Sequence, residues 1–287
     1  MSDLTPNYQQ AEVLSQLTLG KTTEYVSQYT PSLLQGVPRK LNRDSLNITA
    51  QNLPFIGEDV WYGYEISWLN LQGKPIVAVG EFRFPCESEN IVESKSFKLY
   101  LNSFNQSRFA SMAEVEKTLA EDLSAIAKAP AKVVLFPVTD CPALTISSTS
   151  ATCIDDIELT IDNYDFDPEL LKTADKTNSV KVKESLVSHL LKSNCLITNQ
   201  PDWASIYIDY EGETINHANL LRYLISFRQH NEFHEQCVER IFCDLQKYYQ
   251  LDKLTVYARY TRRGGLDINP FRSTYLTTAP VARTLRQ

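Results

Sequence analysis

The chain has 287 residues, of which 43% are apolar, and a net charge of −7. This length suffices for one large domain or two of ordinary size. The acidic balance, with a pI near 5.2, argues against a nucleic-acid surface, which needs clustered Lys and Arg. The chain contains no run of about 18 apolar residues, the length that is needed to span a membrane, and the N-terminus lacks the features of a secretory signal. We therefore expect a cytoplasmic protein with no membrane and no direct nucleic-acid partner.

Cysteine, histidine and glycine narrow the classes of site that the chain can hold. The six cysteines form no CxxC pair, which is typical of free thiols in a reducing cytosol. The four histidines form no HxH or HExxH set, so we expect no metal site. Glycine occurs only nine times and never as GxG, which excludes the dinucleotide-binding fingerprint and the P-loop. Any nucleotide cofactor must therefore bind on another scaffold.

The first half of the chain begins with a segment that predicts an irregular arm. Residues 1–50 are rich in Thr, Ser, Gln and Pro, with a basic cluster at 39–43. Beyond it we expect two strands hinged at Gln72-Gly73-Lys74, two helices and two more strands. In chain order, these elements are the strands 60–69 and 76–84, the helices 93–104 and 112–127, and the strands 132–138 and 157–161.

The second half repeats this order of elements. The chain predicts two strands around the turn 199–202, then two helices and two strands. These are the strands 195–198 and 203–210, the helices 218–228 and 233–249, and the strands 254–260 and 271–276. The last helix places apolar residues at helical spacing on one face, which indicates a buried side.

Two copies of a ββααββ unit, joined by a polar segment near 162–180, imply an α+β protein. Its antiparallel sheets would be covered by paired helices. We expect an N-terminal arm at 1–50, a first unit at 51–165 and a second unit at 166–287. The acidic, turn-rich composition around 162–168 is typical of a linker.

The segment 93–104 places a carboxylate, a hydroxyl and an ammonium on consecutive residues before an apolar stretch. On a helix, Lys95 and Lys98, and likewise Glu93 and Ser96, would share a polar rim at the first turn. A helix N-terminus with a free carboxylate and a lysine suits a small polar ligand and an anionic cofactor. The same residues would equally suit a solvated helix start, and the segment alone leaves both interpretations open.

Cys195 is a candidate nucleophile. It lies beside the polar residues Ser193 and Asn194, and Asp202 returns across a Pro-containing turn toward it. A thiol with a nearby acid can attack an electrophilic carbon and have the adduct protonated in place. The alternative is a small buried hydrophobe, the ordinary role of a lone cysteine.

Two further segments carry charge at turns. Asn231 is a plausible N-cap, which would put His234 and Glu235 in the first turn of a helix. The positive end of the helix dipole would favour the negative charge of Glu235 at this position, but it would not favour a protonated His234. Arg262 and Arg263 precede two glycines at a strand end, a flexible turn with cationic side chains that suits phosphate but is also common as a solvated loop.

Taken together, these residues resemble a known enzyme family. The block 93–100 resembles the signature of the NADPH-dependent 7-cyano-7-deazaguanine reductases, the nitrile reductases of the queuosine pathway. The segments 193–203, 233–235 and 262–265 support the resemblance. The segments 19–25 and 31–34 look like the long, two-unit form of that family. The resemblance implies a tunnelling fold built from ββααββ units, which would bind NADPH without a Rossmann motif.

The resemblance also assigns catalytic roles. It implies that Cys195 is the nucleophile, that Asp202 is the general acid and that His234 lies beside the nitrile. The thiolate would convert the nitrile into a thioimidate, which hydride can reduce once its nitrogen is protonated. Two NADPH per turnover would carry the nitrile through an imine to the aminomethyl product. Burial would keep Asp202 protonated when the nitrile arrives.

The binding residues that the resemblance implies fall into two sets. Glu93 and Glu235 would accept hydrogen bonds from the adjacent donors of the deazaguanine ring. Val92, Ser94 and His234 would flank the substrate. The implied contacts to NADPH are Ser94, Lys95, Arg263 and Gly264.

Three other functions compete with this one. A pterin or purine cyclohydrolase of the same fold commonly uses a His-rich zinc site, for which the chain lacks the spacing. A nitrile hydrolase also passes through a thioimidate, but it needs water in place of hydride. A non-catalytic purine-binding or scaffold protein would use Cys195 as core. Because tunnelling-fold units close barrels by association, we expect a homodimer.

Overall fold

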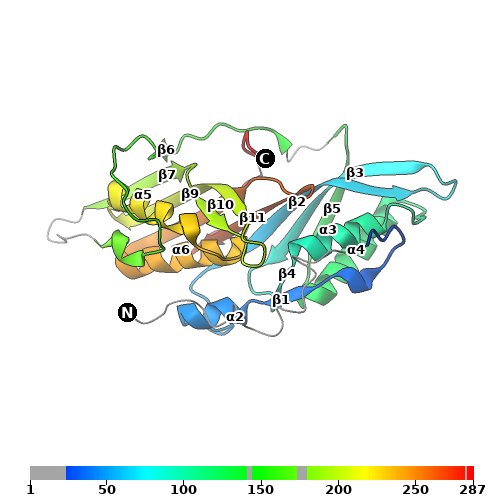
Figure 1. The fold of residues 1–287 in the computed structure, drawn as a ribbon, viewed down its shortest axis with the longest axis horizontal. Coiled ribbons are helices and arrows are strands. Elements are labelled where there is room, and N and C mark those ends of the chain that lie inside the picture. The colour runs from blue at the N-terminus through cyan, green and yellow to red at the C-terminus, as the bar shows by residue number, and fades with distance from the viewer. Residues whose placement is uncertain (1–23, 141–143, 173–179, 282) are drawn as a thin grey trace. The chain divides into compact units, whose positions relative to one another are not determined.

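The computed structural model describes residues 24–140, 144–172, 180–281 and 283–287 (Figure 1). Of the segment 19–25, residues 19–23 lie outside these ranges. Contacts divide the chain into two compact units. Unit 1 comprises Met1–Gln51, Asp59–Leu144 and Arg262–Ile268, and unit 2 comprises Asn52–Glu58, Thr145–Thr261 and Asn269–Gln287. Each unit is made of three segments that are separate in sequence, so this division does not test the boundaries near residues 50 and 165, which stay predictions.

The strands of unit 1 run in the order β5 (Lys132–Pro137), β3 (Pro75–Pro85) and β2 (Ile56–Leu69). The turn between β2 and β3 closes where Gly73 N donates to Asn70 O at 2.9 Å, with Gly73 at φ +83°. Glycine reaches this left-handed region without the steric penalty of a side chain. β3 and β5 pair antiparallel. The predicted strands 60–69, 76–84 and 132–138 are thus confirmed, with small shifts at their ends.

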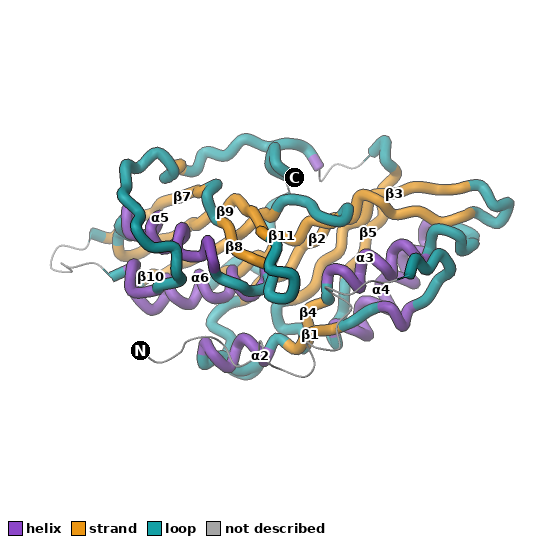
Figure 2. Tube along the Cα trace, viewed as in Figure 1, coloured by secondary structure: helices purple, strands orange, loops and turns teal. Residues whose placement is uncertain are grey.

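The predicted helices of unit 1 are also confirmed, as α3 (Ser94–Ser103) and α4 (Met112–Ala127) (Figure 2). Both are amphipathic, and their apolar faces enter the core. The buried residues of α3 include Phe97, Tyr100 and Leu101, and those of α4 include Val115, Leu119 and Leu123. The same core holds Trp61, Phe82, Val92 and Leu266. In both helices the buried residues recur every three or four positions, which places them on one apolar face.

The predicted irregular arm contains short regular elements over its described residues. They are η2 (Pro31–Leu33), β1 (Gly36–Pro38), α2 (Lys40–Arg43) and η3 (Asp44–Leu46). β1 pairs antiparallel with β4 (Asn90–Val92). The expectation of irregular structure therefore fails over residues 31–46, because β1 pairs with a strand that is remote in sequence and the short helices close with local backbone hydrogen bonds.

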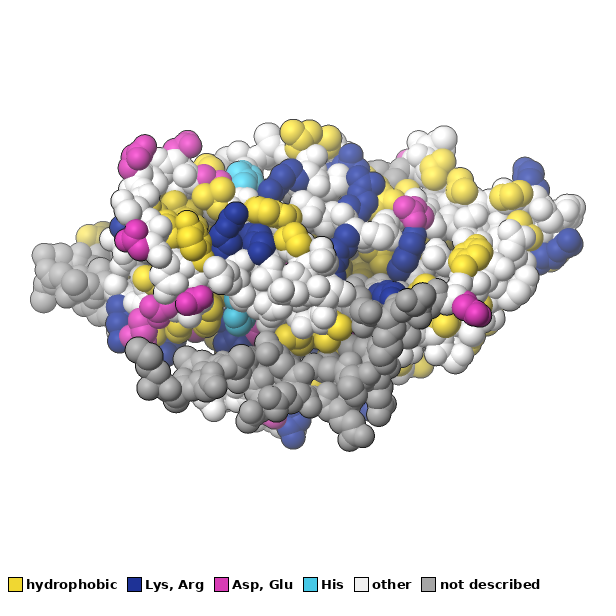
Figure 3. All heavy atoms as spheres, in the orientation of Figure 1, with side chains coloured by type: hydrophobic (Ala, Val, Ile, Leu, Met, Phe, Trp, Pro, Cys, Tyr) yellow, Lys and Arg dark blue, Asp and Glu magenta, His cyan; other side chains and the backbone are white. Residues whose placement is uncertain are grey.

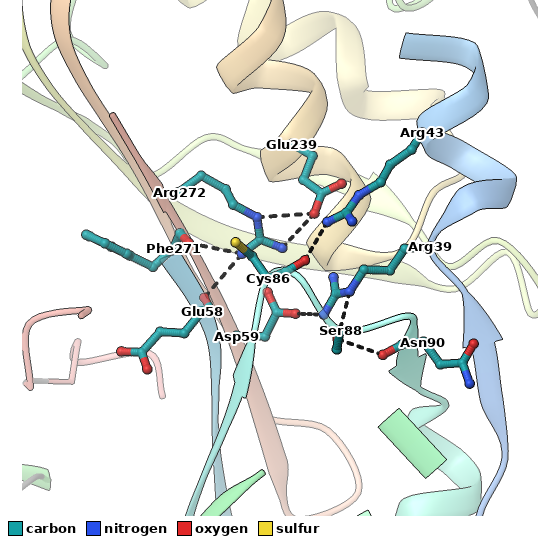
Figure 4. Close-up of polar contacts among 10 residues, drawn as sticks. All are labelled: Arg39, Arg43, Glu58, Asp59, Cys86, Ser88, Asn90, Glu239, Phe271 and Arg272. Carbon is teal, nitrogen blue, oxygen red and sulfur yellow. Dashed lines mark hydrogen bonds and ion pairs between the residues drawn. The ribbon is translucent and has the colours of Figure 1, made fainter. Parts of the chain in front are cut away.

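The basic cluster 39–43 includes two buried arginines, so it does not form an exposed cationic surface. Arg39 forms an ion pair with Asp59 and donates to Ser88 Oγ at 3.0 Å (Figure 4). Arg43 donates to Cys86 O at 2.7 Å. Both arginines are at most 5% exposed. Buried charges need such partners, since their desolvation is costly.

The strands of unit 2 run in the order β11, β10, β9, β7 and β6. Their bounds are β6 Thr152–Cys153, β7 Lys181–Ser188, β9 Pro201–Glu213, β10 Leu251–Tyr260 and β11 Leu266–Ser273, of which β11 begins in unit 1. The pairs β11–β10, β10–β9 and β9–β7 are antiparallel, and β6 pairs parallel with β7. A short strand, β8 (Lys192–Asn194), pairs antiparallel with the start of β9.

The helices of unit 2 are α5 (His217–Ser226), followed by η6 (Phe227–Gln229), and α6 (His234–Tyr248). The apolar stripe predicted for the last helix is buried at Val238, Ile241, Phe242 and Leu245. α6 packs on β10, and both helices lie over the strands of this unit (Figure 1). The predicted helices 218–228 and 233–249 are confirmed.

A buried arginine also supports unit 2. Arg272, in β11, is fully buried and donates to Glu239 Oε1 from Nε and Nη2, at 3.2 and 2.8 Å. Its Nη1 donates to the carbonyls of Glu58 and Phe271 (Figure 4). This network ties β11 to α6 within the unit.

Three predicted strands differ from the structure. Residues 157–161 form no strand, although Ile and Thr favour one, because Thr152–Cys153 takes the pairing edge of β7 instead. The strand predicted at 271–276 instead runs from Leu266 to Ser273. The strand predicted at 195–198 is a turn. The sequence did not predict β7, because only its last three residues are buried.

No helix of the described residues is long and apolar enough to cross a membrane. On the face drawn in Figure 3, Lys and Arg side chains occur together with Asp and Glu side chains.

Candidate active site

Cys195 lies in a tight loop between β8 and β9 of unit 2. Its N–H donates to Gln200 O at 2.8 Å, and Asn199 N donates to Cys195 O at 3.0 Å. Asn199 adopts φ +55°, a left-handed conformation that asparagine tolerates better than most residues. These bonds make the predicted strand 195–198 a turn. They hold the cysteine, which is 2% exposed, at the mouth of the β8–β9 hairpin.

Asp202 lies on the other strand of the same hairpin. The β8–β9 ladder pairs Ser193 with Asp202 and Asn194 with Pro201. The carboxyl group is buried, at 4% exposure for the residue. The candidate nucleophile and the candidate acid thus flank one short loop, as the sequence predicts for a chain that returns across Pro201.

His234 is the first residue of α6. Its Nε2 lies 3.3 Å from Asp202 Oδ1, within ion-pair range, yet the two groups are not aligned for a hydrogen bond. Within the described part of the chain, His234 Nε2 has no hydrogen-bond partner. The ring packs on Tyr260 with centroids 3.9 Å apart. Unit 2 therefore places an imidazole nitrogen beside the Asp202 carboxyl.

Tyr260 is a residue of this cluster that the sequence analysis missed. It ends β10 on the side that faces α6, and its hydroxyl, like that of Ser193, is buried without a hydrogen bond of good geometry among the described residues. Burial, followed by the charges of Cys237 and Asp202, raises the pKa of Tyr260 well above its usual value. The alternation of β10 could have indicated this position, since Val256 and Ala258 lie on the same face.

Cys237 is the other buried thiol near Tyr260. Burial, followed by the charge of Glu232, raises the pKa of the Cys237 thiol well above its usual value. A thiol kept protonated is a poor nucleophile. Cys237 therefore acts as part of the core beneath the cluster.

The segment 230–232 clamps the loop of Cys195. Asn194 N donates to His230 O at 2.8 Å, and Glu232 N donates to Asn194 O at 3.1 Å. The Glu232 carboxylate accepts hydrogen bonds from Arg240 at 2.6 to 3.1 Å and lies 3.0 Å from His230 Nε2. Burial raises the pKa of Glu232, but the charges and hydrogen bonds of Arg240 and His230 outweigh it and lower the pKa to about 2.

The predicted N-cap at Asn231 is wrong. Phe233 occupies the N-cap of α6, and its N–H donates to Gln236 Oε1 at 3.3 Å. Asn231 Nδ2 instead donates to Cys195 O at 3.3 Å and to Asn199 Oδ1 at 2.9 Å. An amide with two donors can hold two acceptors of one loop, a use that the helix-cap pattern does not reveal.

We expect the clamp to make folding stability depend on pH. Because the Glu232 pKa is about 2 in the folded chain and 4.5 normally, its contribution of about 3 kcal/mol is present above pH 4.5 and is lost as the pH falls toward 2. Glu232→Gln should therefore be less stable than wild type near neutral pH. Urea unfolding should show that the difference in unfolding free energy between the two proteins narrows from about pH 5 to about pH 3.

The control for this prediction is Glu121→Gln. Glu121 is 67% exposed and pairs only loosely with Lys117, at 3.8 Å. Its replacement should change stability by less than about 1 kcal/mol at each pH. If the difference in unfolding free energy between wild type and Glu232→Gln stays constant with pH, the segment 230–232 does not stabilise the fold through the charge of Glu232.

Glu93 of unit 1 is the N-cap of α3. Its carboxylate accepts hydrogen bonds from Lys95 N and Ser96 N, both at 2.7 Å. Burial raises the pKa of the carboxyl, whereas these two N–H groups lower it. The free carboxylate expected from the sequence is wrong, because helix capping occupies one lone pair on each oxygen. Val92 packs its side chain into the core of unit 1 and pairs with Gly36.

The four residues that the sequence assigns to the cofactor all belong to unit 1. Ser94 and Lys95 are half-buried in the first turn of α3. Gly264 is exposed at φ +62°, and a Cβ placed there would come no closer than 3.8 Å to Lys98 Cγ. Arg263 N donates to Leu266 O at 2.9 Å, which closes the turn. The turn 262–265 and the first turns of α3 therefore lie close together.

Glu235 is 3% exposed in the first turn of α6. It belongs to unit 2, whereas Glu93 belongs to unit 1. Within unit 2, the structure adds His234 to the pair of Cys195 and Asp202, which the sequence already expected to lie on one turn.

Comparison with known proteins gives three findings. The family model "Nitrile reductase, 7-cyano-7-deazaguanine-reductase N-term" matches residues 25–135, and the model "QueF-like protein" matches residues 201–278. The NADPH-dependent 7-cyano-7-deazaguanine reductase of Colwellia psychrerythraea is 68% identical over 284 residues, 98% of this chain and 99% of that protein. The apo structure of the archaeosine synthase QueF-Like aligns over 37% of this chain and 100% of its own, with 15% identity and a TM-score of 0.28.

Proposed function

Because this chain belongs to the family of NADPH-dependent 7-cyano-7-deazaguanine reductases, we propose that it reduces the nitrile of 7-cyano-7-deazaguanine to an aminomethyl group. The observation that carries the proposal is the 68% identity to a reductase of that name across nearly the whole of both chains. The hairpin that holds Cys195 and Asp202 supports it, because this reaction needs a nucleophile and an acid side by side.

The chemistry starts at Cys195. Its thiolate adds to the nitrile carbon, and Asp202 donates a proton to the nitrogen, which gives a thioimidate. NADPH, when bound, supplies the hydride for each of two reductions. After the first, the C–S bond breaks, the thiolate leaves and an imine remains. After the second, the nitrogen takes up another proton and the amine forms.

His234 and Tyr260 would maintain the acid in this scheme. His234 Nε2 lies 3.3 Å from Asp202 Oδ1, so the imidazole would return a proton to the acid between the two reductions once the two groups align for a hydrogen bond. The ring of Tyr260 packs on the imidazole and would hold it in place. Both side chains are buried, which would keep water from the imine.

Substrate recognition would fall to Glu93 and Glu235. A guanine-like ring presents adjacent N–H donors, and a carboxylate can accept from two of them. Each Glu93 oxygen has a lone pair beyond the one used in capping α3, so it can accept from the ring as well. Ser94 and His234 would border the same ligand. Val92 would contribute its backbone, since its side chain lies in the core.

The cofactor residues of unit 1 fit an anionic group. Gly264 leaves room for a phosphate to approach the backbone. Arg263 precedes it in sequence, and its nearest neighbour, Lys98, lies in the same helix as Lys95, α3, so cationic side chains are available to the phosphate. The N-terminus of α3 adds a positive dipole end. We assign Ser94, Lys95, Arg263 and Gly264 to NADPH on this basis.

We expect Lys95→Ala and Arg263→Ala each to raise the KM for NADPH about tenfold or more while changing kcat little. A lost charge-assisted hydrogen bond costs about 1.5–3 kcal/mol, which acts on binding alone. Steady-state kinetics at saturating nitrile would measure both constants. Lys117→Ala, an exposed lysine of α4, is the control. Unchanged KM values for both variants would move the cofactor site elsewhere.

The wider assignment follows from the chemistry of the product. An aminomethyl deazaguanine is an intermediate for tRNA modification, so we place the enzyme in queuosine biosynthesis without direct contact to tRNA. The five described cysteines are free, which suits a reducing cytoplasm. We also propose a tunnelling fold of two tandem units that pairs into a homodimer, because such units close barrels by association.

The test of this function is turnover with both substrates. Purified protein mixed with 7-cyano-7-deazaguanine and NADPH should lose NADPH absorbance, with two NADPH oxidised per nitrile consumed and the amine as product. Nitrile consumption without NADPH oxidation would identify a hydrolase. Binding of the nitrile with no consumption would identify a binding protein.

A further inference from the structure

A group of three metal-ligating side chains lies in unit 2 apart from the cluster of Cys195. Cys153 ends β6, which pairs parallel with β7 and places Cys153 opposite Val187. Ile154 N donates to Val187 O at 3.0 Å, which continues this pairing. The next residue, Asp155, lies beside the turn that follows β7, because its carboxylate accepts hydrogen bonds from Ser188 and His189.

The three side chains converge on one point. One ligand atom each from Cys153, Asp155 and His189 lie within 4.8 Å of one another. Thiolate, carboxylate and imidazole are the donor types that zinc prefers, and its bond lengths of about 2.0–2.3 Å bring such atoms together around one ion. Cys153 and Asp155 are close in sequence, but His189 lies 34 residues beyond Asp155, so the three form no recognised spacing motif.

The ligands are held by hydrogen bonds of their own. Asp155 Oδ1 accepts from Ser188 Oγ at 2.7 Å, and Oδ2 accepts from His189 N at 2.9 Å. His189 Nδ1 lies 2.8 Å from Ser205 Oγ, so Nε2 would be the nitrogen that is available to a metal. Arg286 Nη2 donates to His189 O at 3.0 Å. Contacts that orient a histidine through its other ring nitrogen are the usual support of a metal ligand.

We propose that Cys153, Asp155 and His189 bind a zinc-class divalent cation, with water in the fourth position. Cys153 and His189 are exposed, so the ion can enter from solvent and keep a water ligand. The ion would balance the negative charge that Asp155 and the Cys153 thiolate bring together. In the absence of a cation, burial and the charge of Asp155 raise the pKa of Cys153, against the N–H of Asp155, which lowers it.

The bound ion would join two segments of unit 2. It would fasten the residues after β6 to the turn between β7 and β8, and β8 leads directly to the loop of Cys195. A ligand that binds only the folded state stabilises it by mass action, so zinc should raise the melting temperature. This site is independent of the proposed reductase chemistry, because none of its ligands belongs to the cluster of Cys195.

Cobalt substitution tests the site directly. Metal-free full-length protein is titrated with Co²⁺, which develops a thiolate-to-cobalt charge-transfer band when sulfur is a ligand, and Zn²⁺ is then added in competition. Wild type should bind one ion per chain with this band, and Zn²⁺ should remove it. Cys153→Ser should lose the band, and His189→Ala, which removes a ligand, should weaken binding by about 100-fold or more, beyond the effect of losing a group that only orients a ligand. Ser205→Ala should weaken it about 10–100-fold.

Matched controls keep the result unambiguous. Cys243→Ser changes a half-buried cysteine of α6 and should retain the band. Circular dichroism of each variant confirms that it is folded, and the exposed position of Cys153 makes its serine variant safe in this respect. No thiolate band in wild type, or a band that persists in Cys153→Ser, would overturn the proposal. A band lost in Cys195→Ser but retained in Cys153→Ser would place the metal at the other cysteine and overturn it equally.

Discussion

We expect Cys195→Ala to abolish NADPH oxidation while leaving the binding of 7-cyano-7-deazaguanine intact. In the proposed mechanism, the nitrile carbon accepts hydride only after the thiolate has added to it, so no step would proceed without the sulfur. Binding should survive because the loop is held by backbone bonds and by Asn231, not by the thiol. Steady-state turnover and equilibrium binding of the nitrile measure the two properties separately.

The control for this prediction is Cys243→Ala, at a half-buried cysteine of α6. It should keep the wild-type rate, which shows that loss of activity belongs to Cys195. Normal turnover by Cys195→Ala would mean that hydride reaches the nitrile without a covalent intermediate.

The second large effect is expected for Asp202→Asn. Loss of a general acid typically lowers the rate by about 10²–10⁴-fold. Asparagine keeps the size of the side chain and leaves the β8–β9 pairing in place. The variant should therefore bind the nitrile and turn over slowly, with kcat falling more than KM changes.

Asp209→Asn is the matched control for Asp202→Asn. Asp209 lies on the same strand, β9, but on the opposite face, and pairs with Thr255 of β10. The same chemical change there should leave kcat within the error of the assay. A kcat for Asp202→Asn equal to that of wild type would remove Asp202 from the reaction and leave His234 as the candidate acid.

The helices and long strands could be predicted because each has one buried face. In α6, the spacing of Val238, Ile241, Phe242 and Leu245 indicates the side that packs on the sheet. The turn at Gly73 was equally clear, since a positive φ there requires the freedom of glycine. Periodicity and turn chemistry act locally, so a single sequence reveals them.

Elements that depend on remote partners were missed or misplaced. Residues 157–161 have strand propensity but pair with no other strand. Thr152–Cys153, which follows a polar stretch of sequence, pairs with β7 instead. Residues 195–198 look extended in sequence but turn, because Gln200 and Asn231 bind the backbone of Cys195. Competition between pairing edges is a property of the whole fold, which local propensity does not contain.

The candidate site shows the same division. Cys195, Asp202, His234 and Glu235 were found from their residue types and from the family resemblance. The capping role of Glu93 and the packing of Tyr260 on His234 were not, because each depends on geometry that residue types do not fix. The Glu232–Arg240 pair was missed for a simpler reason, since both residues lie in a stretch whose charges look like an ordinary solvated helix face.

The central claim is that Cys195 forms a covalent bond to the nitrile carbon. Its most direct test is the intact mass of the protein after incubation with 7-cyano-7-deazaguanine in the absence of NADPH. We expect wild type to gain the mass of one nitrile per chain, Cys195→Ala to gain none, and NADPH to discharge the adduct. An unchanged wild-type mass, under conditions in which the enzyme turns over with NADPH, would contradict the thioimidate mechanism.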